Sequence, residues 1–385
     1  MLTHLAIEGY RSLRELILPL DRLNVVTGGN GSGKSSLYKA LRLMADIGRG
    51  TIVRSLALEG GFNSVLWAGL DGAPTRNPDA PFRPEGTVPK KPISLKLGCA
   101  GEGLGYSIEL GMPPMTRSMF ARDAEIKVEA LWHGERLTPK ALIAERHGPA
   151  LRVRDDQDNW PPQWERIDAG DSFLAQHVDK AYCKDVDYFR KRLSDWRFYD
   201  HFRVDRDAPA RKPQVGVRTP ILSDDGSDLA CALQTILEFG DGVGLTRAIE
   251  DAFDESQLQV CDTGGGFVVT LEQRGLMRPL EVNELSDGTL RYLMLCAALL
   301  SPRPPELLIL NEPESSLSPA LIAPLGRLIE AASRDSQIIV VTHSKILSSQ
   351  LERGGAMMFE LEKERGQTRL KGDEDRRPAW KWPSR

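Results

Sequence analysis

The sequence lacks the features that mark secreted and membrane-spanning proteins. Its five cysteines are odd in number, lie far apart and form no CxxC pair, which is typical of reduced thiols in a cytosolic protein. No apolar stretch reaches the roughly 18 residues that a membrane span needs, and Glu8 and Arg11 interrupt the N-terminus where a signal peptide would be apolar. We therefore expect a cytoplasmic protein with no membrane partner.

The sequence also lacks a strong excess of one charge and any long repeat. Fifty Lys and Arg residues balance 54 Asp and Glu residues, for a net charge of −4, so any contact with nucleic acid must come from a local patch. No internal repeat or sustained heptad pattern occurs, which excludes a long coiled-coil arm. The 385 residues, 41% of them hydrophobic, suffice for one large core or two smaller ones.

The apolar pattern predicts a mixed α/β protein. Short alternating runs between 93 and 153 indicate an antiparallel meander, and the region 197–227, with three prolines, indicates an extended arm. Apolar runs at 307–310 and 338–341 are typical of buried parallel strands. Further strands are predicted at 2–8, 23–27 and 267–271, a loop at 73–92, helical character over 171–196, and helices at 35–46, 228–239, 245–253, 288–300 and 319–332.

A glycine-rich segment between a predicted strand and a predicted helix fits the full pattern G-x-x-x-x-G-K-[ST]. Glycines let successive backbone N–H groups turn toward phosphate oxygens, and the following helix adds its positive end. Lys34 would reach the β and γ phosphates, and Ser35 would hold Mg²⁺. The alternative, a strand-to-helix turn that binds no ligand, is weaker, because the full motif lies between a predicted strand and a predicted helix. The predicted loop contacts are Gly28, Asn30, Gly31, Ser32, Gly33, Lys34, Ser35 and Ser36.

Polar residues follow two predicted parallel strands, at the edge where α/β sheets place their ligands. Glu312 would orient and polarise an attacking water, and Asn311 would accept a hydrogen bond from a metal-bound water. Glu314 either adds charge near the metal or faces solvent, and both interpretations stay open. His343 would touch the γ-phosphate, although a lone histidine is more often structural. Ser286 and Gly288 open a helix and offer a hydroxyl and N–H groups to an anion, in what is otherwise a common N-cap pattern.

Taken in order, these motifs resemble the ABC-type ATPases of the RecF and SMC kind. The phosphate loop is followed by Leu285-Ser-Asp-Gly-Thr289, a strand ending in Asn-Glu-Pro-Glu314, a D-loop-like Ser315–Ser318 and the switch-like His343. The start, Ile7-Glu-Gly-Tyr-Arg11-Ser, and the segments 60–69, 196–202 and 222–229 resemble RecF-related bacterial ATPases along nearly the whole chain. The resemblance implies an ABC-type head with a mostly parallel core sheet, an antiparallel β subdomain and a small α-rich lid.

The resemblance also implies a mechanism. ATP and Mg²⁺ would lie between two copies of the chain, with Lys34, Glu312 and His343 catalytic and Arg11 in the nucleotide set. Contacts from the other copy would come from Ser286, Asp287, Gly288 and Ser318. Three departures together predict slow turnover. Asp287 puts a negative charge near the phosphates, and Asn311 stands where an Asp usually completes the Mg²⁺ shell. No glutamine lies between 60 and 75, so that Ser64 or the backbone before Trp67 would replace it.

The sequence divides into an N-terminal lobe at 1–160, an insertion at 161–280, a C-terminal lobe at 281–365 and a polar tail at 366–385. From 188 to 218, nine Lys and Arg residues outnumber four Asp residues and alternate with aromatics. Arg190, Lys191, Arg192 and Trp196 either grip nucleic acid or form an arm packed on the core. Two roles stay open: DNA repair or maintenance, as in RecF, or a slow ATPase switch acting on a partner protein, as in phage-defence modules.

Overall fold

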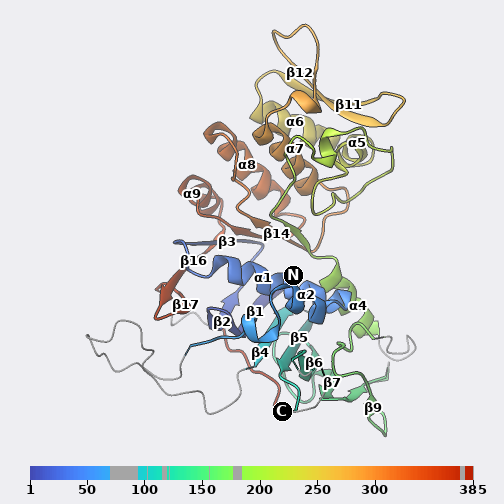
Figure 1. Cartoon of the computed structure of the whole chain (residues 1–385), viewed down its shortest axis with the longest axis vertical. Helices are drawn as coiled ribbons and strands as arrows, with labels where there is room; N and C mark the ends of the chain where they lie inside the picture. The colour runs from blue at the N-terminus through green and yellow to red at the C-terminus, as the bar shows by residue number, and fades with distance from the viewer. Residues whose placement is uncertain are drawn as a thin grey trace, which may run out of the picture. The chain divides into compact units, whose positions relative to one another are not determined.

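The computed structural model describes residues 1–69, 94–101, 103–114, 119–120, 122–155, 157–176, 184–372 and 378–384. The predicted loop at 73–92 lies outside them. The chain forms two compact units (Figure 1). The first contains Met1–Leu20, Gly28–Asp195 and Glu360–Arg385, and the second contains Asp21–Thr27 and Trp196–Phe359. The four-part division made from the sequence stays a prediction. Among the described residues, no helix is long and apolar enough to cross a membrane.

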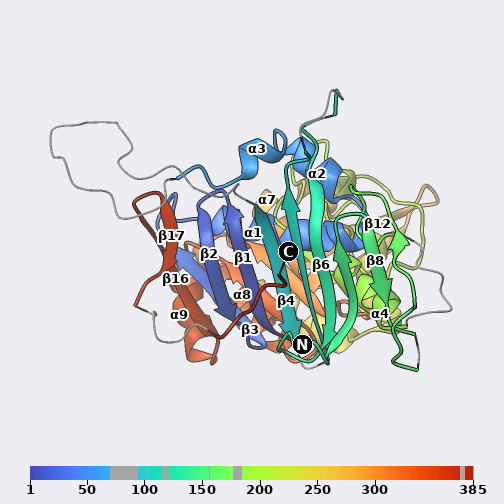
Figure 2. The ribbon, with the colours of Figure 1, turned by 90° about the horizontal axis from the view of Figure 1, so that it is seen from below.

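The first unit is built on an eight-stranded antiparallel sheet, which Figure 2 shows face-on. The alternating runs predicted as a meander form its centre, because each short strand turns back onto the previous one. Its strands, in spatial order, are β2 (Leu13–Pro19), β1 (Leu2–Tyr10), β4 (Leu95–Gly101), β5 (Leu104–Gly111), β6 (Glu125–His133), β7 (Leu142–His147), β8 (Ala150–Val153) and β9 (Glu165–Arg166).

Two helices of the first unit pack closely on each other. α1 (Lys34–Arg49) continues the phosphate loop, and α4 (Lys184–Ser194) is the described helical part of the predicted region 171–196. They meet at Gly48, where an added Cβ would lie 2.8 Å from the Leu193 Cβ, so the crossing needs glycine. The unit also holds α2 (Ile52–Leu58), α3 (Phe62–Val65) and a hairpin of β16 (Met357–Glu364) and β17 (Gln367–Leu370), of which β16 begins in the second unit.

The end of the chain packs on this sheet. The Trp380 ring lies 5.8 Å from the Trp132 ring and 5.4 Å from the Trp382 ring, between centroids. Gly98 makes room for it, since an added Cβ there would lie 2.4 Å from Trp380. Part of the predicted polar tail is therefore attached to the first unit through its aromatic side chains.

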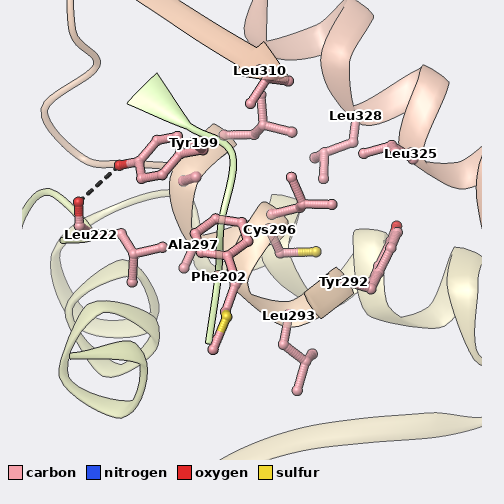
Figure 3. Close-up of a cluster of buried hydrophobic side chains, with 14 of the residues drawn as sticks. Tyr199, Phe202, Leu222, Tyr292, Leu293, Cys296, Ala297, Leu310, Leu325 and Leu328 are labelled. Carbon is pink, nitrogen blue, oxygen red and sulfur yellow. Dashed lines mark hydrogen bonds between the residues drawn. The ribbon is translucent and has the colours of Figure 1, made fainter. Parts of the chain in front are cut away.

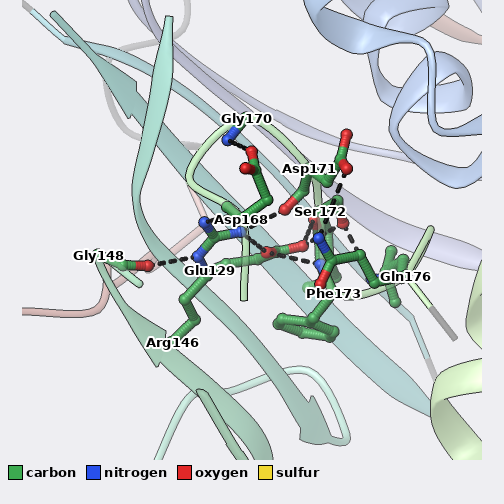
Figure 4. A network of polar contacts seen from close by, with 11 residues as sticks. Glu129, Arg146, Gly148, Asp168, Gly170, Asp171, Ser172, Phe173 and Gln176 are labelled. Atoms are coloured by element: carbon green, nitrogen blue, oxygen red, sulfur yellow. Dashed lines mark hydrogen bonds and ion pairs between the residues drawn. The ribbon is translucent and has the colours of Figure 1, made fainter. Parts of the chain in front are cut away.

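A buried ion pair joins the sheet to the segment that follows it (Figure 4). Glu129 and Arg146 are both fully buried, with 3.5 Å between charged atoms. The guanidinium donates to the Gly148 and Asp168 carbonyls, each at 2.6 Å. Glu129 accepts from the Phe173 N–H at 3.2 Å and from two hydroxyl groups. Burial raises the pKa of Glu129, although Arg146 acts in the opposite direction.

We expect Arg146→Met to destabilise the protein by about 3–5 kcal/mol, because it leaves the buried Glu129 carboxylate without its cation. Loss of the cation raises the pKa of Glu129 further in the folded state. The folded protein then favours the protonated acid, so the variant keeps most stability at low pH and loses it as pH rises. Urea unfolding should show a larger loss at pH 8 than at pH 5. The control Arg327→Met breaks an exposed ion pair. An equal loss of unfolding free energy at both pH values, or an equal loss in the control, would contradict this prediction.

The second unit contains the predicted parallel sheet. Its strands pair in the order β10 (Arg197–Tyr199), β14 (Leu307–Asn311), β15 (Gln337–Val341) and β3 (Leu23–Gly28), all parallel. Helices α7 (Asp287–Leu299), α8 (Pro319–Ala332) and α9 (Lys345–Arg353) belong to it. Within the predicted insertion lie α5 (Leu229–Phe239), α6 (Gly242–Ala252), β11 (Ser256–Asp262), β12 (Phe267–Gln273) and the start of β13 (Leu280–Glu281), and short 3-10 turns lie at Pro209–Arg211 and Val282–Glu284.

The region predicted as an extended arm supplies aromatic side chains to the core of the second unit (Figure 3). Tyr199 and Phe202 pack with the apolar side of α7, and the Tyr199 hydroxyl donates to the Leu222 carbonyl at 2.8 Å. Trp196 is 1% exposed and Phe198 is fully buried. These rings cannot stack on nucleic-acid bases, which removes Trp196 from the predicted nucleic-acid site.

Candidate functional site

The phosphate loop links β3 to α1 and depends on glycine for its shape. Gly28, Gly31 and Gly33 have φ values of 148°, 75° and 109°, which other residues adopt only with strain. Gly33 also permits a close approach, since an added Cβ would lie 2.1 Å from the Thr368 hydroxyl oxygen. No side chain caps α1 among the described residues, so the first turn of the helix keeps N–H groups for an anion.

Lys34 is already aimed at this loop. Its ammonium group donates to the Gly28 carbonyl at 2.6 Å and the Gly29 carbonyl at 3.1 Å, and the residue is 8% exposed. Both acceptors are neutral, so phosphate oxygens would be stronger partners for the same nitrogen. The arrangement places a cation where the motif needs one.

A cavity of about 560 Å³ opens beside the loop. Four cationic side chains line it, from Arg11, Lys34, Lys363 and Arg365, and no acidic residue does within the described part of the chain. The arrangement suits a polyanion. The other lining residues are Ser12, Gly31, Ser32, Gly33, Ser35, Ser36, Ser64, Leu66, Trp67, Ala68, Gly69 and Gly366.

The cavity brings together most of the predicted nucleotide set. Arg11 joins the loop residues from Gly31 to Ser36, whereas Gly28 and Asn30 belong to the same loop without lining the cavity. Ser64 lies in its wall, as does Leu66, the residue before Trp67; these are the two predicted replacements for a glutamine. Lys363, Arg365 and Gly366 were missed, because about 330 residues separate them from the loop and no motif marks them.

Arg11 is held by an acid before any ligand binds. Its guanidinium lies 2.6 Å from the Glu59 carboxylate, which also accepts from the Tyr10 hydroxyl at 2.7 Å. The side chain of Arg11 is 33% exposed, and its backbone has a φ of 48°. Glu59 therefore fixes the direction of Arg11 at the cavity wall.

In the second unit, Glu312 and His343 lie together at the carboxyl ends of two neighbouring strands. The His343 Nδ1 atom is 3.5 Å from the Glu312 carboxylate. Glu312 has a φ of 47° and its N–H donates to the Val341 carbonyl at 2.7 Å. A left-handed backbone at a residue other than glycine is costly and is often found at functional sites. Its side chain is 44% exposed, so a ligand can reach it.

Glu314 does not face solvent, so that interpretation is wrong. The residue is 7% exposed and its carboxylate accepts from the Ser344 N–H at 3.1 Å, the His343 N–H at 3.3 Å and the Thr342 hydroxyl. The same oxygen lies 3.7 Å from the His343 ring. Glu314 thus orders the turn that carries His343.

The predicted signature begins α7 and lies against the D-loop-like segment. The Ser286 hydroxyl accepts from the Thr289 N–H at 3.1 Å and caps the helix. An added Cβ on Gly288 would lie 2.8 Å from the Ser316 carbonyl oxygen. Ser318 is the N-cap residue of α8. Within this unit, the residues predicted to act on a second copy are therefore neighbours.

Arg211 changes the expectation for Asp287. The guanidinium lies 2.7 Å from the Asp287 carboxylate and donates to the Val282 and Leu285 carbonyls at 2.9 Å each. It is 6% exposed. Asp287 therefore does not add an uncompensated negative charge, which corrects the prediction. Sequence reasoning missed this link, since 76 residues separate the pair.

The predicted basic residues of the arm lie on α4 in the first unit. Arg190 pairs with Asp187 at 2.7 Å, and Arg192 lies over the Tyr188 ring at 5.6 Å from its centroid. Part of the positive charge of α4 is thus engaged within the helix. Lys191 shares the helix, whereas Trp196 is buried and belongs to the second unit.

Over residues 23–349 the chain matches the family described as "AAA domain, putative AbiEii toxin, Type IV TA system". No curated protein matches the sequence. Among solved structures, an SMC head bound to the C-winged helix domain of ScpA has a TM-score of 0.51 and 11% identity, covering 96% of this chain and 97% of that chain. An Smc head with an extended coiled coil, derived from Pyrococcus furiosus and bound to the C-terminal domain of ScpA, has a TM-score of 0.53 and 11% identity, covering 96% and 95%. At this identity the likeness shows the fold, that of an ABC-type ATPase head with parallel and antiparallel sheets.

Proposed function

Since the chain belongs to the AAA-domain family that it matches over residues 23–349, an ABC-type branch related to the RecF and SMC ATPases, we propose that the protein is an ATPase. It would bind ATP with Mg²⁺ and hydrolyse it to ADP and phosphate. The observation that carries the proposal is the cavity of the first unit, in which the phosphate loop faces a set of cations and no acid from the described residues. Lys34 and the N–H groups at the start of α1 would hold the phosphates.

The predicted metal and catalytic residues would each have a separate role. Ser35 would hold Mg²⁺, and Asn311 would accept a hydrogen bond from one of its waters. When bound, the metal neutralises phosphate charge. Glu312 would orient the attacking water, with His343 held beside it by Glu314. Hydrolysis is expected to be slow, because Asn311 lacks the charge of a carboxylate.

We further propose that ATP joins two copies of the chain, with Ser286, Asp287, Gly288 and Ser318 of one copy contacting the nucleotide of the other. The direct experiment is phosphate release from Mg-ATP, measured alone and with single-stranded or double-stranded DNA. Stimulation by DNA supports a role in DNA repair or maintenance. No phosphate release under any condition would contradict the ATPase proposal.

A second candidate role is an ATP-dependent switch that acts on a partner protein. The family description, which names a putative toxin of a toxin–antitoxin system, favours it. The burial of the aromatic rings of the predicted arm, which cannot stack on bases, also favours it. If the unmutated protein does not bind DNA at low salt with ATP and Mg²⁺ present, the DNA role is wrong and this candidate remains.

If DNA does bind, the α4 cations are the first residues to test. Replacing Arg190, Lys191 and Arg192 with Ala should weaken binding and reduce the slope of log affinity against log salt by about 0.7–0.9 for each lost phosphate contact. Trp196→Ala should instead lower the melting temperature, because it leaves a cavity in the core. DNA affinity is measured at two salt concentrations. An unchanged slope in the triple variant would place the DNA contact elsewhere.

A further inference from the structure

Two cations in the phosphate cavity come from the β16–β17 hairpin: Lys363 lies near the end of β16, and Arg365 lies in the turn. Lys363 and Arg365 line the same space as Lys34 and Ser35. Both are exposed, and neither has an ion-pair or side-chain hydrogen-bond partner among the described residues. Their hairpin lies beyond residue 349, where the family match ends, and no motif assigns it a role.

Other cations of the same hairpin are neutralised within it. Arg369 lies 2.7 Å from the Glu364 carboxylate, and Lys371 lies 2.8 Å from the Glu360 carboxylate. Neither lines the cavity. The hairpin thus separates its cations into a paired set and an unpaired set, and the unpaired set lies in the cavity.

The hairpin is attached directly to the phosphate loop. The Thr368 hydroxyl oxygen lies 2.8 Å from both the Ser32 carbonyl oxygen and the Ser12 hydroxyl oxygen, and the Thr368 N–H donates to the Ser12 carbonyl at 2.8 Å. Thr368 is fully buried, and Gly33 leaves the space it occupies. These bonds hold β17 against the loop, so its turn has a defined place in the cavity.

The turn also completes the wall of the cavity. An added Cβ on Gly366 would lie 3.8 Å from the Trp67 ring, so the tip of the hairpin reaches the Ser64–Gly69 segment. With the hairpin in place, Arg11, Lys34, Lys363 and Arg365 share one cavity, and no acidic residue of the described segments lines it. Like charges in one cavity repel each other, and a bound polyanion removes that repulsion.

We propose that Lys363 and Arg365 bind the polyphosphate of the nucleotide from the hairpin side of the cavity, so that the C-terminal hairpin is part of the nucleotide site. The inference rests on the proposed binding of ATP. Lys363 and Arg365 would recognise the negative charge of the ligand. Their contribution to the binding free energy should therefore grow with the number of phosphates.

The test is calorimetric binding of ATP, ADP and AMP, each with Mg²⁺, to the variant Lys363→Ala/Arg365→Ala. We expect ATP affinity to fall on the order of tenfold for each lost charge-assisted contact, with smaller losses for ADP and then AMP. The salt dependence of ATP binding should also weaken. The matched control, Arg369→Ala/Lys371→Ala, removes the same charges from the same hairpin and should bind ATP like the unmutated protein.

Two further variants make the result decisive. Lys363→Arg/Arg365→Lys keeps both charges and should keep most of the affinity, and Lys34→Met should lose ATP binding. Unchanged ATP affinity in Lys363→Ala/Arg365→Ala would overturn the inference, as would an equal loss for ATP, ADP and AMP or an equal loss in the control. If the unmutated protein binds none of the three nucleotides, it is the proposed ATPase function that fails instead.

Discussion

Lys34→Met is expected to lower ATP affinity by about 100-fold or more. The ammonium group would bond to two phosphates, and each hydrogen bond to a charged group contributes about 1.5–3 kcal/mol. Met keeps an unbranched side chain that is one atom shorter, and it removes the charge and the donors. Binding is measured directly by calorimetry with Mg-ATP. If affinity is unchanged, the phosphate-loop assignment is wrong.

Lys34→Met is also expected to lower the stability of the protein without ligand, so a control variant is needed. Lys34 donates to the Gly28 and Gly29 carbonyls, so Met leaves these acceptors without that partner and should lower the melting temperature. Lys39→Met removes a lysine from the same helix without touching the cavity. It should leave ATP affinity unchanged, which separates loss of the phosphate contact from a general change in α1.

Local sequence patterns predicted much of the fold. The phosphate loop could be found because its glycines, lysine and serine are consecutive, and because a strand and a helix flank it. The parallel strands β14 and β15 are continuous apolar runs, and α8 was predicted with its observed bounds. These signals lie within a few residues of each other, so one sequence is enough to detect them.

What could not be predicted depends on contacts between distant parts of the chain. Lys363 and Arg365 reach the phosphate cavity only because Thr368 bonds to Ser32, and nothing near them in the sequence indicates it. Arg211 neutralises Asp287 in the same way. Trp196 shows a different limit of sequence-based prediction. Alternating basic and aromatic residues occur both on protein surfaces that bind nucleic acid and in segments that pack on a hydrophobic core. Burial, which decides between them, is a property of the folded chain.

Glu312→Gln is expected to lower the rate of ATP hydrolysis by about 10²–10⁴-fold, the usual contribution of a positioned general base, while ATP still binds. Gln has nearly the same shape and suits the left-handed backbone at this position as well as Glu does. Phosphate release and ATP affinity are measured together. Glu352→Gln, on the exposed side of α9, serves as the control and should hydrolyse ATP normally. Normal hydrolysis by Glu312→Gln would contradict its role.

The same variant tests whether ATP joins two copies of the chain. Because bound ATP is not consumed, Glu312→Gln with saturating Mg-ATP at micromolar concentration should accumulate as a dimer in light scattering. Adding Ser286→Arg should prevent the dimer by placing bulk and charge at the signature. Ser286 also caps α7, so the matched control is Asp241→Arg in the same background, which removes a similar cap from α6 and should leave the dimer intact. A monomer in Glu312→Gln despite bound ATP would reject the two-copy site, and a dimer that survives Ser286→Arg would place the contact away from the signature.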